Sequence, residues 1–154
     1  MIREAKPSDY ESMDSVFRAS AKKLCTASYD KEVIEAWAGK SWPERFVKGA
    51  KEGNNQYVLL KDDVVVCFGS INLEKKLLVS LFVSPEFVGQ GLGQIMIEFL
   101  LDMAKSKGVE VLHLDSSLNA VNFYSRNGFK EKARCKYKTQ NGVLMESVQM
   151  ECSL

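Results

Sequence analysis

A short apolar run, a glycine-rich loop and a long glycine-free segment follow one another in this chain and constrain its fold most strongly. The apolar run covers residues 77–83, and its length and its Val and Phe content favour a buried strand. Ser84-Pro85 ends the run, because proline has no N–H to give to a strand ladder. The loop GQGLGQ occupies residues 89–94, and residues 95–105 then predict a helix that closes near Gly108.

This succession of strand, loop and helix favours the binding of an anion at the helix N-terminus, where backbone N–H groups lack partners. Glycines at alternate positions let a phosphate approach the backbone, and the helix dipole adds about 0.3–1 kcal/mol. The spacing G-x-G-x-G matches neither a P-loop nor a dinucleotide fingerprint, since Gln94-Ile95 stands where those motifs need other residues. A flexible connection that is merely glycine-rich is the alternative interpretation.

Composition and charge exclude several classes of partner. A chain of 154 residues with 45% hydrophobic and 27% charged residues is typical of one globular domain, here residues 1–154. A formal charge of +1 gives no general attraction to nucleic acid or to a membrane surface, and no run has the length of a membrane span. The four cysteines are far apart and there is one histidine, so we expect free thiols, no metal site and a cytoplasmic location.

The rest of the chain predicts one mixed α/β sheet with helices on both faces. Strands are predicted at residues 2–5, 56–60, 64–73, 77–83, 109–114, 129–138 and 143–152, and helices from a cap at Ser8 or Asp9 to Leu24 and at 31–38, 43–51, 95–105 and 119–127. Asp62-Asp63 and Asn141-Gly142 predict hairpin turns. The strand–helix–strand unit in the middle predicts a parallel crossover. An exposed last strand would allow a homodimer.

Two motifs carry a resemblance to a known family. The first is LFVSPEFVGQGLG at residues 81–93, and the second is NAVNFYSRNGF at residues 119–129. In this order and at this separation they resemble the acyl-CoA-binding core of the GNAT superfamily of N-acetyltransferases. The predicted order of strands and helices is similar to that fold over essentially the whole chain. Residues 34–38, which follow a Ser-Tyr pair, resemble an uncharacterised bacterial subgroup of GNAT proteins.

The resemblance implies a site for acetyl-CoA as cosubstrate. The strand at 81–83 would hydrogen-bond the pantetheine arm, the loop would hold the pyrophosphate, and Tyr124 would protonate the leaving thiolate as general acid. A phenol with a pKa of about 10 can give a proton to a thiolate with a pKa near 8.5. The implied cofactor-binding residues are Leu81, Phe82, Val83, Val88, Gly89, Gln90, Gly91, Leu92, Gly93, Gln94, Asn119 and Asn122.

The sequence departs from the family pattern in three places. Val88 stands where an arginine or glutamine is usual, and Ser117 stands where an asparagine is common. Asn119 could replace that asparagine, or it could instead cap the helix that follows. Val79 and Ser80 occupy the part of the strand where many relatives carry a carboxylate as general base.

Other residues are candidates for the base and for the acceptor site. Glu74 and Asp115 are candidate bases, with Glu146 and a relay through His113 as further options, and a water-relayed base or no base also fits the sequence. Tyr29 and Trp37 are candidate walls of an acceptor site, with simple core packing as the alternative. Cys67 and Cys135 lack a histidine partner in any recognisable motif, which disfavours a covalent acyl intermediate.

We therefore expect an N-acetyltransferase that moves an acetyl group from acetyl-CoA to a primary amine by direct attack in a ternary complex. The amine belongs to a small molecule or a peptide, and the near-neutral charge does not select between them. A CoA-binding module without catalysis, used as a sensor or partner, is the first alternative. A nucleotide-binding fold unrelated to CoA is the second, and the loop spacing disfavours it.

Overall fold

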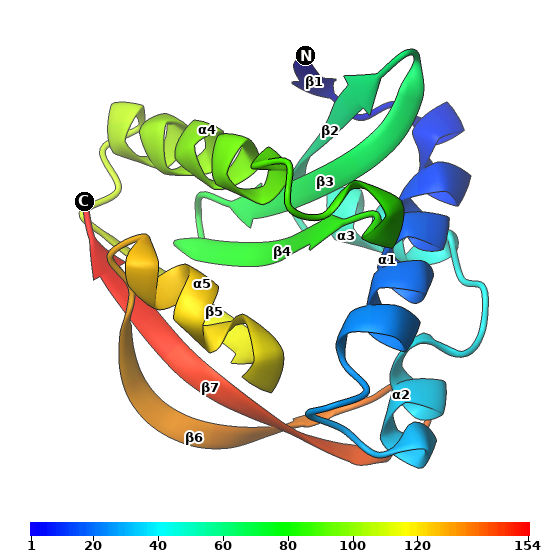
Figure 1. The fold of residues 1–154 in the computed structure, drawn as a ribbon. Coiled ribbons are helices and arrows are strands. Elements are labelled where there is room, and N and C mark those ends of the chain that lie inside the picture. Colours follow the sequence, from blue (N-terminus) through cyan, green and yellow to red (C-terminus); the bar gives the residue numbers. More distant parts are fainter.

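The predicted order of strands and helices is confirmed in a computed structural model, which describes residues 1–154. The strands are β1 (Ile2–Glu4), β2 (Asn55–Lys61), β3 (Val64–Asn72), β4 (Leu77–Val83), β5 (Val111–Ser117), β6 (Lys130–Lys138) and β7 (Leu144–Ser153), and the helices are α1 (Tyr10–Leu24), α2 (Lys31–Ala38), α3 (Glu44–Lys51), α4 (Leu92–Ser106) and α5 (Val121–Arg126). They form one seven-stranded sheet in the order β1-β2-β3-β4-β5-β7-β6 (Figure 1). Only β4 and β5 pair in parallel.

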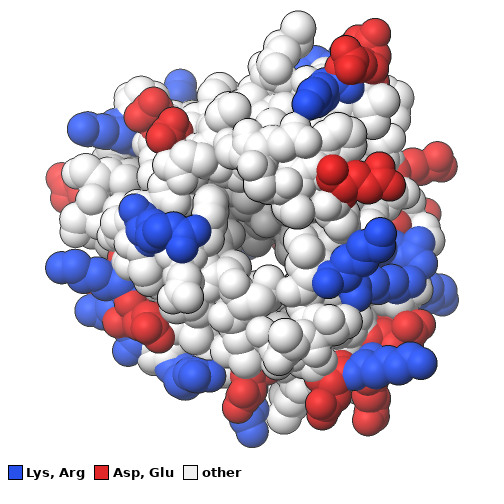
Figure 2. All heavy atoms as spheres, viewed as in Figure 1, with Lys and Arg blue, Asp and Glu red and all other residues white.

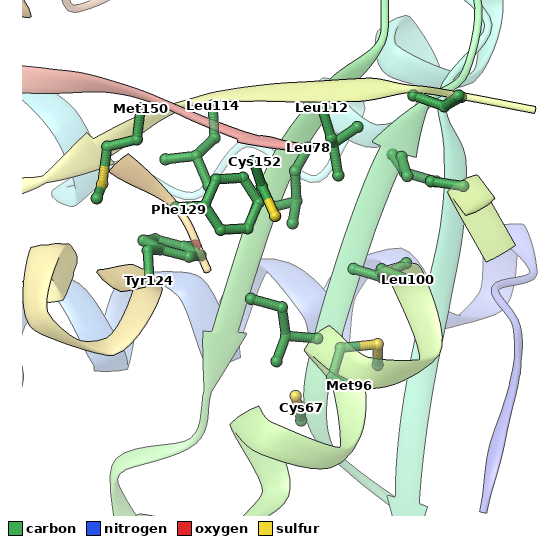
Figure 3. Close-up of a cluster of buried hydrophobic side chains, with 14 of the residues drawn as sticks. Cys67, Leu78, Met96, Leu100, Leu112, Leu114, Tyr124, Phe129, Met150 and Cys152 are labelled. Atoms are coloured by element: carbon green, nitrogen blue, oxygen red, sulfur yellow. The ribbon is translucent and has the colours of Figure 1, made fainter. Parts of the chain in front are cut away.

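Helices cover both faces of this sheet, as the sequence predicts. On one face, Met13 and Phe17 of α1 pack against Val58 and Phe68 of the sheet. On the other face, α4 and α5 share a larger core, of which Figure 3 shows the centre. Each large apolar side chain buried in these layers stabilises the fold by about 1.5–3 kcal/mol. None of the helices combines the length and the apolar content needed to cross a membrane.

A glycine in β3 lets α4 lie close to the sheet. A Cβ atom on Gly69 would come within 2.8 Å of Leu100 Cδ1 and 2.9 Å of Met96 Cγ, both of which belong to α4. Any larger residue would therefore push the helix away from the strand. This close contact fixes α4, and with it the loop that precedes α4, against the middle of the sheet.

The parallel pair β4–β5 is confirmed, but the two strands meet only where they begin. Leu77 pairs with His113, and the His113 N–H donates to the Lys76 carbonyl at 2.9 Å. A β-bulge at Val79 interrupts the pairing of β4 with β3, because Ser80 opposes Ser70 whereas Leu78 opposes Ile71. Bulges bend a strand and increase its twist. Beyond its first residue β4 therefore diverges from β5, and its backbone on that side lacks a strand partner.

The last strand does not lie at the edge of the sheet, so this expectation from the sequence is wrong. β7 lies between β5 and β6 and pairs with β5 from Val111↔Ser153 to Ser117↔Ser147. The edge strand next to β7 is β6, whose basic residues at alternate positions are Lys130, Lys132, Arg134, Lys136 and Lys138. Charged side chains on an edge strand oppose pairing with another chain. The reason for expecting a homodimer is thereby removed.

Two expected helix caps are also wrong. Asp9 is the residue before α1, as predicted, but its side chain does not cap the helix, because its carboxylate accepts the Lys6 N–H at 2.7 Å and pairs with Arg3 at 2.7 Å. Asn119 is not a cap either. It lies inside a 3₁₀ turn at Leu118–Ala120, and the residue before α5 is Ala120. The Asp9 side chain thus takes a local backbone partner that sequence spacing alone does not reveal.

Candidate active site

A cleft of about 460 Å³ opens where β4 and β5 diverge. Its floor is formed by residues 77–82 of β4 and by Phe68 and Ser70 of β3. Aromatic side chains from α1, α2 and the start of α3 form one wall, and residues of β5, α5 and β7 form the other. Figure 2 shows a hollow at the centre of this face, surrounded mainly by uncharged atoms, with both basic and acidic groups farther out.

Tyr124 projects from α5 into this cleft. Its side chain is 7% exposed, and its ring packs against Phe129 with the centroids 5.7 Å apart (Figure 3). Burial raises the pKa of the Tyr124 phenol above its ordinary value of 10.0, and the neighbouring Cys67 thiol raises it further. The Tyr124 hydroxyl is therefore protonated at neutral pH and remains a proton donor well into the alkaline range.

The glycine loop leads into a helix N-terminus that no side chain caps. Gly91 is the residue before α4, with φ at 77°, and the first turn of α4 contains no acidic residue. Gly89 has φ at 80°, and a Cβ atom at either glycine would meet nothing within 4 Å. The first N–H groups of α4 thus have no side-chain cap, the space beside the two glycines is open, and the positive end of the helix dipole lies at this point.

A lysine that the sequence analysis missed lies beside this loop. Lys61, at the end of β2, donates from Nζ to Gln90 Oε1 at 2.8 Å, and the same nitrogen lies 5.6 Å from the centre of the Phe87 ring. This contact joins residues 29 positions apart, so no local motif marks it. It adds a positive charge next to a loop in which Val88 replaces the usual polar residue.

Side-chain amides connect the loop to the helix that carries Tyr124. Gln94 Nε2 donates to Asn127 Oδ1 at 2.8 Å, and Asn127 Nδ2 donates to the Phe123 carbonyl at 2.9 Å. A Cβ on Gly93 would lie 3.5 Å from both Phe123 and Val83, which is ordinary contact. The end of β4, the start of α4 and α5 are thus held together as one unit.

Comparison with known proteins decides the family. A family model described as an acetyltransferase (GNAT) domain matches residues 25–154. This chain belongs to the GNAT family. A [ribosomal protein bS18]-alanine N-acetyltransferase from Salmonella typhimurium is 31% identical over 111 residues, which cover 66% of this chain and 74% of the relative.

Solved structures agree with this GNAT assignment. A GCN5-related N-acetyltransferase from Rhodopseudomonas palustris superposes with a TM-score of 0.92 at 28% identity, covering 100% of this chain and 95% of that one. A PaiA N-acetyltransferase from Thermoplasma acidophilum, crystallised in complex with coenzyme A, has the same fold, with a TM-score of 0.79 at 23% identity and coverage of 100% and 98%.

Only some of the predicted site residues of this GNAT domain line the cleft. Leu81 and Phe82 line the cleft, whereas Asn119 and Asn122 are exposed and do not line it. Of the candidate bases, Asp115 on β5 and Glu146 on β7 line the cleft. Glu74 is exposed in the β3–β4 turn and does not contribute to the lining. Glu52, just after α3, is a cleft carboxylate that the sequence analysis did not single out.

The cysteines offer no nucleophile in this GNAT domain. Cys67 is fully buried, and burial raises the pKa of its thiol from 9.0 to about 12. The reactive thiolate is therefore almost absent at neutral pH. Cys135 is half-buried on the edge strand β6 and does not line the cleft. These placements disfavour a covalent acyl intermediate on Cys67 or Cys135.

Tyr29 and Trp37 both line the cleft, and they differ in what they contact. The Tyr29 hydroxyl donates to the Glu146 carbonyl at 2.6 Å and accepts the Leu118 N–H at 2.9 Å. Its hydroxyl thus joins the segment before α2 to β7 and to the 3₁₀ turn that precedes α5. The Trp37 ring packs against Phe82 with the centroids 6.0 Å apart and presents an apolar surface.

We expect Tyr29→Phe to lower the free energy of unfolding by about 1–3 kcal/mol, because it leaves two backbone groups without their partner. Chemical denaturation measures this change. Tyr57→Phe is the matched control, since the Tyr57 hydroxyl contacts only the Met103 sulfur at 3.3 Å, and we expect a smaller loss. Equal losses in the two variants would show that the bonds made by Tyr29 do not stabilise the fold.

Proposed function

We propose that this domain transfers an acetyl group from acetyl-CoA to a primary amine by direct attack within a ternary complex. The observation that carries the proposal is the free edge of β4, which borders the cleft between the glycine loop and Tyr124. An extended pantetheine arm fits such an edge, because its amides can pair with the backbone of residues 81–83 as a strand would. The pyrophosphate then meets the N–H groups at the start of α4, with Lys61 close by.

In the proposed reaction the amine nitrogen attacks the thioester carbonyl carbon, and the C–S bond of the tetrahedral intermediate breaks. Tyr124 gives its proton to the departing thiolate, so that free CoA leaves as a thiol. The ammonium proton of the acceptor passes through water to the Tyr124 phenolate or to a carboxylate of the cleft. Asp115 and Glu146 are the candidates for this second step, and the support for them is that they line the same cleft as Tyr124.

A CoA-binding module without catalysis is the second candidate. The observation that favours it is the absence of a carboxylate on the floor of the cleft, where β4 carries Val79 and Ser80. Tyr124 argues against it, because binding of CoA alone does not require a tyrosine hydroxyl in the cleft. Turnover separates the two candidates.

The test is the release of free CoA thiol from acetyl-CoA with a panel of primary amines, measured across pH. We expect turnover that rises with pH as the amine loses its proton and then stays level up to about pH 10, since the pKa of Tyr124 is raised above 10.0. The raised pKa means that the acid form persists as pH increases. A fall in rate between about pH 8 and pH 10, with the protein still folded, would contradict Tyr124 as the acid.

The same samples distinguish the alternatives. Calorimetric binding of acetyl-CoA without any turnover supports the non-catalytic module. Absence of acetyl-CoA binding by the folded protein contradicts both candidates. Displacement of bound acetyl-CoA by ATP or NAD would favour a nucleotide site instead.

A further inference from the structure

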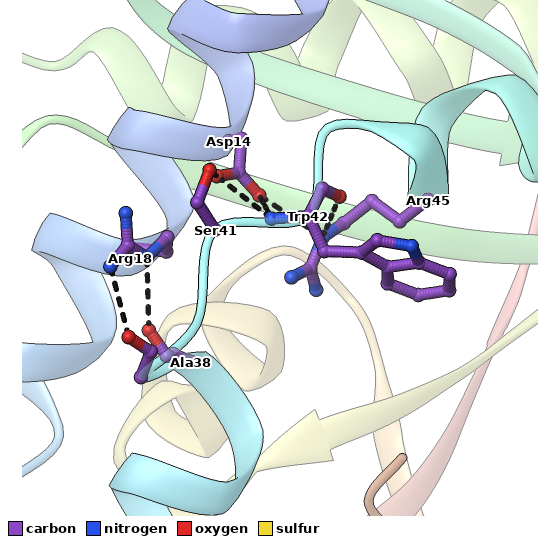
Figure 4. Close-up of polar contacts among 7 residues, drawn as sticks. Asp14, Arg18, Ala38, Ser41, Trp42 and Arg45 are labelled. Carbon is purple, nitrogen blue, oxygen red and sulfur yellow. Dashed lines mark hydrogen bonds and ion pairs between the residues drawn. The ribbon is translucent and has the colours of Figure 1, made fainter.

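A half-buried arginine is fixed in the aromatic wall of the cleft. Arg45, in the first turn of α3, has a side chain 22% exposed, and its guanidinium carbon lies 4.6 Å from the centre of the Phe17 ring. Its Nε donates to the Trp42 carbonyl at 3.1 Å and lies 3.3 Å from Asp14 Oδ1 (Figure 4). The Asp14 carboxylate is in turn held by the Trp42 N–H at 3.3 Å and by the Ser41 hydroxyl at 3.2 Å. The guanidinium is therefore held in one orientation.

The two terminal nitrogens of this guanidinium make no hydrogen bond to the protein. The hydrogen bond that Arg45 donates comes from its Nε (Figure 4). The side chain is partly exposed and lines the cleft. Two adjacent N–H groups of a planar guanidinium match the two oxygens of a carboxylate. Arg45 thus presents a prepared site for a carboxylate on the cleft wall.

Charge is divided between the two walls. On the α3 side, the exposed Lys48 and Glu52 lie one helical turn apart and offset each other, and Asp14 pairs with Arg45 at its Nε, so the terminal N–H groups of Arg45 are the cationic donors that this wall offers. On the opposite side, Asp115 and Glu146 are acidic. A molecule with a carboxylate at one end and an ammonium at the other complements this division.

The surface between the two charged walls is apolar. The Phe17 ring beneath Arg45 packs against Phe82 of β4 with the centroids 4.9 Å apart, and Trp37 packs against Phe17 at 5.1 Å. Arg45 is thus one aromatic ring away from the strand along which the proposed pantetheine arm lies. That separation suits a small acceptor with an apolar side chain.

We propose that the acceptor is a free apolar amino acid, whose carboxylate Arg45 binds while the amine faces β4. This inference rests on the proposed acetyl transfer and names its substrate class. It distinguishes a free amino acid from the N-terminus of a polypeptide, in which the corresponding carboxyl group is an amide and carries no charge. Loss of a charge-assisted contact of this kind corresponds to about a 10- to 100-fold change.

The experiment compares apolar amino acids with their own amides. Release of CoA thiol is measured for leucine, methionine, phenylalanine and tryptophan and for the four matching amides, which keep the side chain but lack the carboxylate. Because an amide lowers the pKa of the neighbouring amine, each rate is divided by the fraction of unprotonated amine at the assay pH. In the wild type we expect kcat/KM to be about 10- to 100-fold higher for at least one acid than for its amide. In Arg45→Gln we expect this preference to vanish because the acid becomes slow, with the rate for the amide little changed.

A second arginine variant controls for general damage to the fold. Arg18 of α1 donates to the carbonyls of Ala38 and Gly39 and does not line the cleft. We expect Arg18→Gln to lower stability while keeping the preference for the acid. If Arg45→Gln fails to fold, the comparison of acid with amide in the wild type still tests whether the acceptor carboxylate is recognised.

Equal rates for acids and amides in the wild type would overturn the inference, as would a preference that Arg45→Gln leaves unchanged. Transfer to peptide N-termini with none to any free amino acid would overturn it as well. Each of these results leaves the proposed acetyl transfer in place. Calorimetry with acetyl-CoA on the same samples tests the proposed function separately. If the folded protein does not bind acetyl-CoA, the proposed acetyl transfer itself is wrong.

Discussion

Gly91→Asp is expected to weaken acetyl-CoA binding by at least ~100-fold, which calorimetric titration would register as loss of measurable heat. The new carboxylate would stand beside the first N–H groups of α4, where the pyrophosphate is proposed to bind. Two unit charges 4 Å apart repel by about 1 kcal/mol in water and about 4 kcal/mol near a protein surface, and a pyrophosphate carries more than one charge. The space is available, since a Cβ atom at Gly91 meets nothing within 4 Å.

Gly91→Asn provides the matched control for this prediction. Asparagine has the shape of aspartate without its charge, and both residues tolerate the left-handed backbone conformation at φ 77°. We expect the asparagine variant to bind acetyl-CoA far more tightly than the aspartate variant. Equal weakening in both would mean that backbone strain is the cause, and unchanged binding in both would place the pyrophosphate elsewhere.

Tyr124→Phe is expected to reduce kcat by about 100- to 10,000-fold, the usual contribution of a positioned general acid. The affinity for acetyl-CoA should change little, because the phenol is proposed to act on the leaving group and not on the bound arm. The fold should also persist, since the ring that packs against Phe129 is kept. Single-turnover kinetics, with thermal denaturation alongside, measure both properties.

The comparison with Tyr29→Phe sharpens this prediction. Both tyrosines line the cleft, but the Tyr29 hydroxyl has two backbone partners and no hydrogen bond contributes to the raised pKa of Tyr124. Loss of rate without loss of stability is therefore expected of Tyr124→Phe alone. A rate within threefold of the wild type would contradict the proposed acid role and revive the non-catalytic module.

The parts of this molecule that could be predicted from its sequence are those set by local patterns. The strand, glycine loop and helix from Leu77 to Gly108 are encoded by apolar run length, proline and glycine placement and helix-compatible residues within one short segment. The Asp62-Asp63 hairpin turn is also encoded locally, and its two residues have positive φ values of 50° and 63°. The helix α4 begins three residues before the predicted start, because the last residues of the loop already have helical conformation.

Features that depend on contacts between distant segments escaped prediction. The insertion of β7 between β5 and β6 follows from pairing along both of its sides, which an alternating pattern does not encode. Lys61 beside Gln90, and Arg45 held by Asp14, each join elements far apart in the chain. Glu74 and Glu52 are both glutamates near turns, so the sequence does not distinguish them. Only the folded structure shows that Glu52 lines the cleft and Glu74 does not.

The divergence of β4 from β5 has a consequence for how affinity and reactivity are divided. Beyond Leu77, the edge of β4 that faces β5 has backbone N–H and C=O groups without a strand partner. A bound molecule that runs along β4 can pair with these groups and so continue the sheet. Under the proposed function, the part that pairs is the long arm of the cosubstrate, whereas the reacting acyl tip lies beyond it. The energy that retains the cosubstrate then depends little on which acyl group it carries, and selection among acyl groups is left to the rate of transfer.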